Sequence, residues 1–224
     1  MIPNLDWGRF EAALFDVDGT LYDQGQLRRI MAFELAMWCL THPLRFREAK
    51  ILATFRRLRE EHYAREETSI MEAQYQWTAD ALNVPATEVR RIADEWLLKR
   101  PLRHLLNCRP PGLGELFERL RARKIKIGVF SDYPAQEKLA ALRLKADAVA
   151  CALDTSVNRL KPHPAGLQCI CEQLRVHPNA CLHLGDRLDR DEPCARSCGC
   201  ESLILSARTA KGLGRERSYD LLFP

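Results

Sequence analysis

Four short polar clusters in the sequence carry side chains that could bind a divalent cation and an anion. The clusters are Asp16-Val-Asp18-Gly-Thr20, Ser131-Asp132, Lys161-Pro162, and Gly185-Asp186 with Asp191. Carboxylates are the hard oxygen ligands that Mg²⁺ prefers, whereas ammonium and hydroxyl groups suit the oxygens of a phosphoryl group. Gathered in one place, these side chains could therefore support metal-assisted phosphoryl transfer.

The first cluster supplies two carboxylates with complementary uses. Asp16 and Asp18 are two residues apart, so in an extended backbone their side chains point to the same side. Gly19 allows the chain to turn tightly away from this point. One carboxylate can attack phosphorus and form an aspartyl-phosphate while the other handles protons, provided that a cation masks the repulsion between two anions.

The other clusters supply the remaining parts of such a site. Asp186 offers a further hard oxygen ligand, and Asp191 could hold a metal-bound water or orient a neighbouring cation. Lys161 provides a compact positive charge that can stabilise the nucleophile and the transferring phosphoryl oxygens. Ser131 adds a hydroxyl donor, and both it and Asp132 could also cap the helix that follows them.

Sequence patterns place these clusters at the ends of strands. An apolar run over residues 11–17 predicts a buried parallel strand that leads into the first cluster. After the rigid link Cys108-Arg-Pro-Pro-Gly112, helical and strand-like patterns alternate. Helices are predicted over 113–123, 135–144, 164–174 and 192–197, and strands over 125–130, 149–153, 181–184 and 202–205. This alternation indicates a parallel sheet with helices on both faces, and ligands at the carboxyl ends of its strands.

The stretch from about residue 26 to residue 106 has a different character. It contains no second strand-like run, and its apolar residues recur with helical spacing. A first helix is predicted to end at His42-Pro43, and further helices are predicted over 46–65, 70–82 and 86–99. The last residues, 206–224, show no convincing period, so we assign them to a surface segment.

Taken in order, the four clusters resemble the motifs of the haloacid dehalogenase-like hydrolase superfamily. The matching strings are DVDGT at 16–20, FSD at 130–132, LKP at 160–162 and GDRLDRD at 185–191. By this resemblance Asp16 is the nucleophile, Asp18 is the general acid and base, and Lys161 completes the catalytic group. The implied phosphate-binding residues are Ser131, Asp132 and Lys161, and the implied Mg²⁺ ligands are Asp16, Asp18 and Asp186, with support from Asp191.

The resemblance also implies a fold and a domain organisation. It indicates an α/β fold with a Rossmann-like, doubly wound parallel sheet, formed by residues 1–21 and 108–224. Residues 22–107 would then form an all-helical cap domain, inserted between the first two motifs, that selects the substrate. This is the arrangement of the helical-cap subfamily, and the chain looks like its phosphoglycolate phosphatase-like members.

The implied reaction is the Mg²⁺-dependent hydrolysis of a small phosphorylated metabolite. Dehalogenases of this family carry a different residue at the second aspartate position, so Asp18 argues against dehalogenation. A phosphomutase with the same core chemistry stays open as an alternative. So does a non-catalytic binding or scaffold protein, because Lys124 and Asn158 stand where glycine is common and Asp132 stands where asparagine is frequent.

Composition bounds the partners and the compartment. The chain has 224 residues, of which 29% are charged, and its net charge of +4 makes no strong electrostatic case for nucleic-acid binding. No apolar run approaches the ~18 residues that a membrane span needs, and the N-terminus does not resemble a signal peptide. We therefore expect a cytoplasmic monomer or homodimer that acts on a metabolite, with no nucleic-acid or membrane partner.

The chain also contains nine cysteines. An odd number in an enzyme-sized chain without an export signal predicts reduced thiols rather than disulfides. Cys194, Cys198 and Cys200 lie close together, as do Cys169 and Cys171, but none of them shows the paired C-x-x-C spacing of a structural zinc site. We expect the cysteines after the fourth motif to act as small buried hydrophobes.

Overall fold

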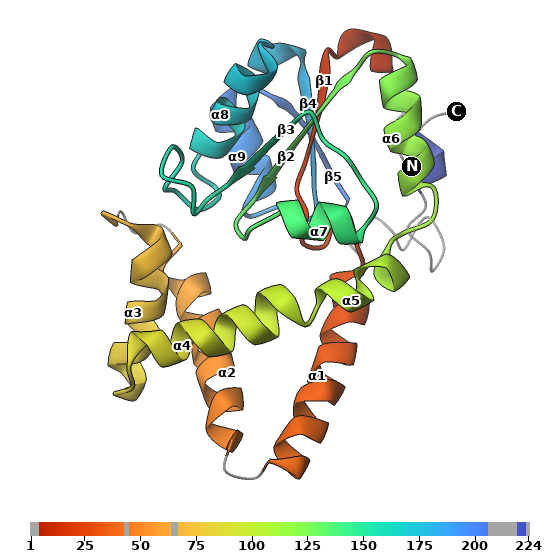
Figure 1. The fold of residues 1–224 in the computed structure, drawn as a ribbon. Coiled ribbons are helices and arrows are strands. Elements are labelled where there is room, and N and C mark those ends of the chain that lie inside the picture. The colour runs from red at the N-terminus through yellow and green to blue at the C-terminus, as the bar shows by residue number, and fades with distance from the viewer. Residues whose placement is uncertain (1–4, 43–44, 64–66, 206–218, 223–224) are drawn as a thin grey trace.

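A five-stranded parallel sheet forms the centre of the molecule (Figure 1). The computed structural model describes residues 5–42, 45–63, 67–205 and 219–222. The strands are β1 (Ala12–Phe15), β2 (Lys126–Ser131), β3 (Ala148–Cys151), β4 (Cys181–Gly185) and β5 (Glu201–Ile204). Their order is β3-β2-β1-β4-β5, so the chain fills one side of β1 first and the other side afterwards. A topological switch point, where ligands bind in such sheets, therefore lies beside β1.

Helices cover both faces of the sheet. They are α6 (Leu113–Ala122), α7 (Gln136–Ala141), α8 (Ala165–Leu174) and α9 (Asp191–Cys198). All residues of β1 are buried, and successive side chains point to opposite faces. Phe15 packs in the hydrophobic cluster that includes α6 and α7, whereas Leu14 packs in the cluster that includes α8 and α9. The predicted α/β fold is confirmed, and its strands and helices end within a few residues of their expected positions.

A second group of helices lies beyond the carboxyl ends of the strands (Figure 1). It comprises α1 (Gln24–Thr41), α2 (Phe46–Glu61), α3 (Ile70–Leu82), α4 (Ala86–Ala93), a π-helical stretch (Asp94–Lys99) and α5 (Leu102–Leu105). The chain enters the group at Asp23, whose side chain caps α1 by accepting a hydrogen bond from the backbone N–H of Gln26 at 2.9 Å. Division of the chain into a core and a cap, with boundaries at 22 and 107, stays a prediction.

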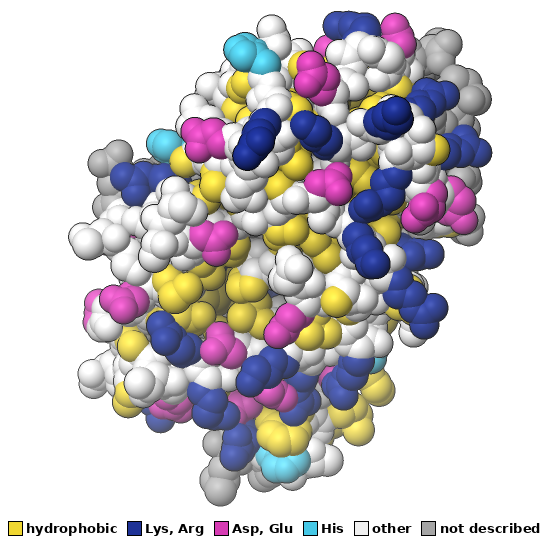
Figure 2. Space-filling model, turned by 45° about the horizontal axis from the view of Figure 1, so that its top comes forward, with side chains coloured by type: hydrophobic (Ala, Val, Ile, Leu, Met, Phe, Trp, Pro, Cys, Tyr) yellow, Lys and Arg dark blue, Asp and Glu magenta, His cyan; other side chains and the backbone are white. Residues whose placement is uncertain are grey.

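The surface carries both signs of charge. On the face drawn in Figure 2, Lys and Arg side chains lie among Asp and Glu side chains. This mixture is consistent with the small net charge of +4. None of the helices within the described ranges combines the length and the apolarity that a bilayer crossing requires.

Part of the C-terminal segment is buried, which corrects the prediction of a surface segment. Residues 219–222 form a 3₁₀ turn in which Tyr219 and Leu222 are only 3% and 2% exposed. The Tyr219 hydroxyl donates to the backbone carbonyl of Thr20 at 2.5 Å, and the Trp7 indole donates to the carbonyl of Leu222 at 2.7 Å. These contacts join opposite ends of the chain, so no local pattern could reveal them. Residues 206–218 and 223–224 lie outside the described residues.

We predict that Leu222→Ala lowers the free energy of unfolding by about 2–5 kcal/mol, because it removes a buried side chain and leaves a cavity. Urea denaturation at neutral pH measures this change. The matched control is Leu40→Ala on α1, where the leucine is 70% exposed and the expected change is small. Equal effects of the two substitutions would contradict the packing of the C-terminal turn.

Candidate active site

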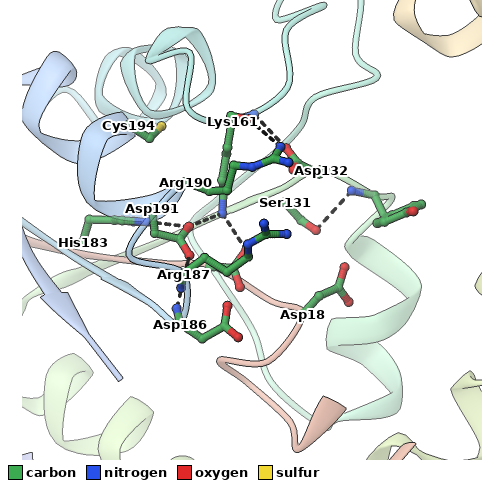
Figure 3. Close-up of polar contacts among 12 residues, drawn as sticks. Asp18, Ser131, Asp132, Lys161, His183, Asp186, Arg187, Arg190, Asp191 and Cys194 are labelled. Carbon is green, nitrogen blue, oxygen red and sulfur yellow. Dashed lines mark hydrogen bonds and ion pairs between the residues drawn. The ribbon is translucent and has the colours of Figure 1, made fainter. Parts of the chain in front are cut away.

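The carboxyl ends of the strands bring the four polar clusters to one edge of the sheet. Asp16 follows β1, Ser131 ends β2, and Asp186 follows β4. Lys161 comes from the loop between β3 and α8, and Asp191 is the first residue of α9. In Figure 3 the labelled side chains from these segments converge on one region. The predicted assembly of the site from distant segments is therefore observed.

A buried ion-pair network around Lys161 forms the middle of the site. The Nζ atom of Lys161 lies 2.5 Å from Oδ1 of Asp16 and 2.8 Å from Oδ1 of Asp191. Lys161 is only 3% exposed. Burial by itself would lower the pKa of this ammonium group, but the charges of Asp16 and Asp191 outweigh burial and raise the pKa well above its usual value. Lys161 is therefore held in its positive form.

Protein donors occupy both oxygens of Asp191. In addition to Lys161, Nε2 of His183 lies 3.3 Å from Oδ1. Oδ2 accepts hydrogen bonds from the backbone N–H groups of Asp186 and Arg187, at 3.2 and 3.0 Å. Burial opposes ionisation of Asp191, yet Lys161 and His183 bring its pKa below the usual value. With its oxygens already used, Asp191 is suited to holding Lys161 and the Asp186 loop in place.

Asp16 differs from Asp191 in how its two oxygens are used. Its Oδ2 is buried and has no hydrogen-bond partner among the described residues. Burial raises the pKa of Asp16 well above its usual value; Lys161 opposes this shift, whereas Asp191 and Asp186 add to it. A carboxylate in this setting needs a further positive charge nearby if it is to stay ionised.

The acidic side chains around Asp16 are arranged as a cation could use them. Oxygens of Asp16, Asp186 and Asp191 all lie within 4.8 Å of one another. Opposite ligands of a Mg²⁺ ion, each at ~2.1 Å, lie about 4.2 Å apart, so one ion fits this spacing. Gly19 permits the close approach of Asp186, because its φ is 99° and a Cβ there would lie 2.2 Å from Oδ2 of Asp186. The donor set suits a hard divalent cation.

The carboxylate of Asp18 turns to a separate pair of donors. The Nζ atom of Lys138 lies 2.5 Å from its Oδ1, and the Tyr22 hydroxyl donates to the same oxygen. Asp18 accordingly lies apart from the cluster around Lys161 in Figure 3. Burial raises the pKa of Asp18, but Lys138 and Tyr22 outweigh burial, so the pKa lies below its usual value. The two aspartates line one cavity but have different partners.

Ser131 and Asp132 make local contacts with neighbouring loops. The Ser131 hydroxyl accepts a hydrogen bond from the backbone N–H of Tyr133 at 3.2 Å. Oδ1 of Asp132 accepts from the backbone N–H of Lys161 at 3.0 Å, and the Asp132 carbonyl accepts from Arg59 on α2 at 2.9 Å. Asp132 therefore fixes the loop that carries Lys161. The predicted part of both residues in phosphate binding stays a prediction.

Several charged residues around the site were missed from the sequence. Lys138 lies on α7, outside every motif. Arg190 donates to a carboxylate oxygen of Glu60 at 2.8 Å and to the carbonyl of Lys161 at 3.2 Å, and so connects α2 to the loop that carries Lys161. Arg187 also pairs with Glu60, at 2.9 Å. Both arginines lie within the GDRLDRD string, so the sequence placed them near the fourth motif. Nothing in the sequence indicated that Glu60 is their partner.

A cavity of about 450 Å³ lies over these groups. Its lining includes Asp16, Asp18 and Lys161 from the sheet side. From the helical side it includes apolar residues such as Met31 and Trp96. This volume and this mixture of apolar walls with a few convergent polar groups are typical of a site for a small molecule.

Comparison with known proteins gives a family and a fold. The model of the haloacid dehalogenase-like hydrolase family matches residues 10–199. No curated protein is significantly similar to the chain in sequence. Among solved structures, the β-phosphoglucomutase of Clostridium difficile is 20% identical, with a TM-score of 0.61 over 95% of this chain and 93% of that chain.

Two further solved structures have similar folds and other activities. The 2-haloacid dehalogenase of Pseudomonas syringae pv. Tomato is 21% identical, with a TM-score of 0.58 over 94% of this chain and 90% of that one. A candidate phosphoglycolate phosphatase of Lactobacillus delbrueckii subsp. bulgaricus is 21% identical, with a TM-score of 0.55 over 92% of both chains. At these identities the similarity shows a shared fold, so the reaction has to be argued from the site.

We predict that Lys138→Met raises the pKa of Asp18, because it removes the strongest charge that favours the carboxylate. Carbon-13 NMR titration of the Asp18 carboxyl group measures the shift, and Lys138→Arg, which keeps the charge, is the control. A carboxyl group whose pKa is lower in the folded than in the unfolded state stabilises the fold at pH values above its unfolded-state pKa. This stabilisation is lost as the pH falls through the folded-state pKa. The stability difference between Lys138→Met and the wild type should therefore shrink in acid. An unchanged or lower Asp18 pKa in Lys138→Met would contradict the assigned pair.

Proposed function

Because the chain belongs to the haloacid dehalogenase-like hydrolase family, we propose that it is a Mg²⁺-dependent phosphatase that hydrolyses a small phosphorylated metabolite. The observation that carries this proposal is the buried contact of Lys161 with Asp16, 2.5 Å from Nζ to Oδ1, beside a second Asp16 oxygen that has no partner among the described residues. A phosphomutase with the same core chemistry is the alternative, followed by a non-catalytic binding protein.

The residues present fit a bound Mg²⁺ ion. Oδ2 of Asp16 is free of protein donors among the described residues, and Asp186 lies beside it, so these two carboxylates would hold the ion. The backbone carbonyl of Asp18 is the further ligand that the family motif implies. Asp191 supports the site from behind, because its own oxygens already bind Lys161 and the backbone of the Asp186 loop. When bound, Mg²⁺ offsets the repulsion between Asp16 and an anionic substrate.

In the first step, Asp16 attacks the phosphorus atom of the substrate. A bond forms between a carboxylate oxygen of Asp16 and phosphorus, and the bond from phosphorus to the leaving oxygen breaks. Lys161 lies against Oδ1 of Asp16 and is held positive, so it can also contact the oxygens of the transferring phosphoryl group. Asp191 and the Asp132 contact to the Lys161 backbone keep this ammonium in place.

Asp18 handles the proton in both steps. The leaving oxygen takes a proton from Asp18, and in the second step Asp18 takes a proton from the water that attacks the aspartyl-phosphate. Hydrolysis then returns Asp16 and releases inorganic phosphate. Lys138 and Tyr22 hold Asp18 in its ionised form, which is the form needed for the second step. To act as an acid in the first step, Asp18 must lose its contact with Lys138 and take up a proton.

We predict that the protein releases phosphate from p-nitrophenyl phosphate only with Mg²⁺, and that Asp16→Asn lowers kcat by about 10⁴-fold or more, because an amide cannot replace the nucleophile. EDTA should abolish turnover, and added Mg²⁺ should restore it. The control is Asp189→Asn, whose carboxylate is 64% exposed and pairs with Arg187. Activity that survives in Asp16→Asn would contradict the assignment.

The same preparation separates the alternatives. A phosphomutase would isomerise a sugar monophosphate in the presence of the matching bisphosphate, at a rate above its release of phosphate. A non-catalytic protein would show neither reaction, and Asp16→Asn would then equal the wild type. Either outcome replaces the phosphatase proposal.

The cavity also indicates a property of the substrate. Arg28 on α1 and Arg56 on α2 line it, and no ion pair or hydrogen bond of either guanidinium group is found within the part of the chain that the structure describes. Burial lowers the pKa of Arg56, and the positive charge of Arg28 acts in the same direction. A negative group between the two arginines would offset both effects. We therefore propose a substrate that carries a second anionic group beside its phosphoryl group.

We predict that Arg56→Ala lowers kcat/KM by about 10–100-fold for substrates with a second anionic group, because a charge-assisted hydrogen bond is worth about 1.5–3 kcal/mol. Phosphoglycolate and a sugar bisphosphate are compared with p-nitrophenyl phosphate, for which the change should be small. Arg57→Ala is the matched control, since Arg57 already pairs with Glu61 at 2.8 Å. An equal loss on all substrates would remove the argument for a second anionic group.

A further inference from the structure

Four buried cysteines gather at the opposite edge of the sheet from Lys161. Cys171 lies in the last turn of α8, Cys181 begins β4, Cys198 ends α9, and Cys200 directly precedes β5. None of the four is more than 9% exposed, and no disulfide joins them. The starts of β4 and β5 define the amino edge of the sheet, whereas the candidate active site lies at the carboxyl edge. The thiols therefore form a second, separate cluster.

The spacing of the sulfur atoms is close to that of a metal–thiolate centre. The Sγ atoms of Cys171, Cys198 and Cys200 all lie within 4.8 Å of one another. The Sγ atom of Cys181 lies 3.8 Å from that of Cys171. Four sulfurs at ~2.3 Å from a tetrahedral Zn²⁺ ion lie about 3.8 Å from each other. Cys181 is not part of the group of three, so its side chain would have to turn toward the other sulfurs to complete a four-sulfur shell.

Local backbone geometry brings two of the ligands together. Gly199 stands between Cys198 and Cys200 with a φ of 89°, a left-handed conformation that ends α9. The N–H of Cys200 then donates to the carbonyl of Ala195 at 2.9 Å, which closes the turn. The turn places the two thiols, one on the helix and one before the strand, on the same side of the chain.

The surroundings of the cluster favour a cation. Thiolates this close together would repel one another, so a cation between them is needed if all four thiols are to lose their protons. The carboxyl ends of α8 and α9, which carry partial negative charge, also meet here.

We propose that Cys171, Cys181, Cys198 and Cys200 bind one Zn²⁺ ion as four thiolates, with release of their protons to solvent. Soft thiolate sulfurs select Zn²⁺ over Mg²⁺, so the site is chemically distinct from the carboxylate cluster. Four protein ligands complete a tetrahedral shell and leave no position for a substrate, which makes the role structural. A disulfide would use only two of the four sulfurs and requires them ~2.05 Å apart. The ion would join α8, β4 and the turn between α9 and β5.

Metal content and cobalt spectroscopy test this site directly. The full chain, purified in reducing buffer, should contain about one Zn²⁺ per molecule by mass spectrometry of the metal. Replacement by Co²⁺ should give thiolate-to-cobalt charge-transfer bands and the intense visible bands of a tetrahedral centre. These bands cannot arise from the carboxylate cluster and should persist in Asp16→Asn. Removal of Zn²⁺ by a chelator should lower Tm, and added Zn²⁺ should restore it.

Single substitutions identify the ligands. Cys198→Ser and Cys171→Ser should each weaken Zn²⁺ binding at least about tenfold. Cys194→Ser is the matched control, because Cys194 is also buried but donates to the carbonyl of His163 at 3.3 Å and lies outside the cluster. If a cluster variant fails to fold, the cobalt spectrum of the wild type decides the question. Three results would each overturn the proposal. They are the absence of charge-transfer bands, a Cys171–Cys181 disulfide in peptide maps, and a loss of Zn²⁺ binding in Cys194→Ser equal to that in the cluster variants.

Discussion

The buried charge of Lys161 is the interaction on which the candidate active site depends. Asp16 and Asp191 come from different segments and are 7% and 2% exposed. Two carboxylates this deeply buried lose hydration and repel each other, and a cation between them is needed to offset both costs. Lys161 contacts both, and loss of one partner from such a buried network typically costs about 3–5 kcal/mol. The same ammonium group thus keeps the loops together and prepares the site for an anion.

The pKa values of Asp16 and Asp18 are shifted in opposite directions, and this shapes the chemistry of the site. Burial and the neighbouring carboxylates raise the pKa of Asp16, whereas Lys138 and Tyr22 more than offset burial at Asp18 and lower its pKa. Enzymes assign acid and base roles to two carboxyl groups by placing them in environments that shift their pKa values apart. The proposed mechanism needs Asp16 ionised and Asp18 protonated at its start, whereas these two pKa shifts favour the opposite protonation states. A divalent cation beside Asp16 and a substrate anion that competes for Lys138 would each favour the required form.

The sequence allowed prediction of the parts of the site that depend on strand ends. Asp16, Ser131 and Asp186 follow from a simple rule, because the carboxyl ends of parallel strands share one edge. Lys138 could not be found in this way, since its role depends on which face of α7 meets Asp18. Tyr219 was equally hidden, because its hydroxyl reaches Thr20 from the other end of the chain. Contacts of this kind depend on tertiary packing, so they produce no periodic pattern in the local sequence.

The cysteines show a related limit of sequence spacing. A search for C-x-x-C pairs detects ligands that one short loop presents, yet Cys171 and Cys181 are ten residues apart and lie on a helix and a strand. Cys198 and Cys200 have a spacing that becomes useful only because Gly199 adopts a left-handed conformation. Four thiols contributed by α8, β4 and the turn between α9 and β5 therefore looked like unrelated small hydrophobes. Their convergence is a property of the sheet order.

The two clusters lie at opposite ends of the same two elements. β4 begins at Cys181 and leads into Asp186, and α9 begins at Asp191 and ends at Cys198. A zinc ion at the thiol edge would fix the far ends of both elements without touching a substrate. Because Asp191 holds Lys161 at 2.8 Å and the backbone of Asp186 at 3.2 Å, a small rotation of α9 would disturb both contacts. The proposed zinc site would therefore influence the active site through the rigidity of β4 and α9, and not through its own charge.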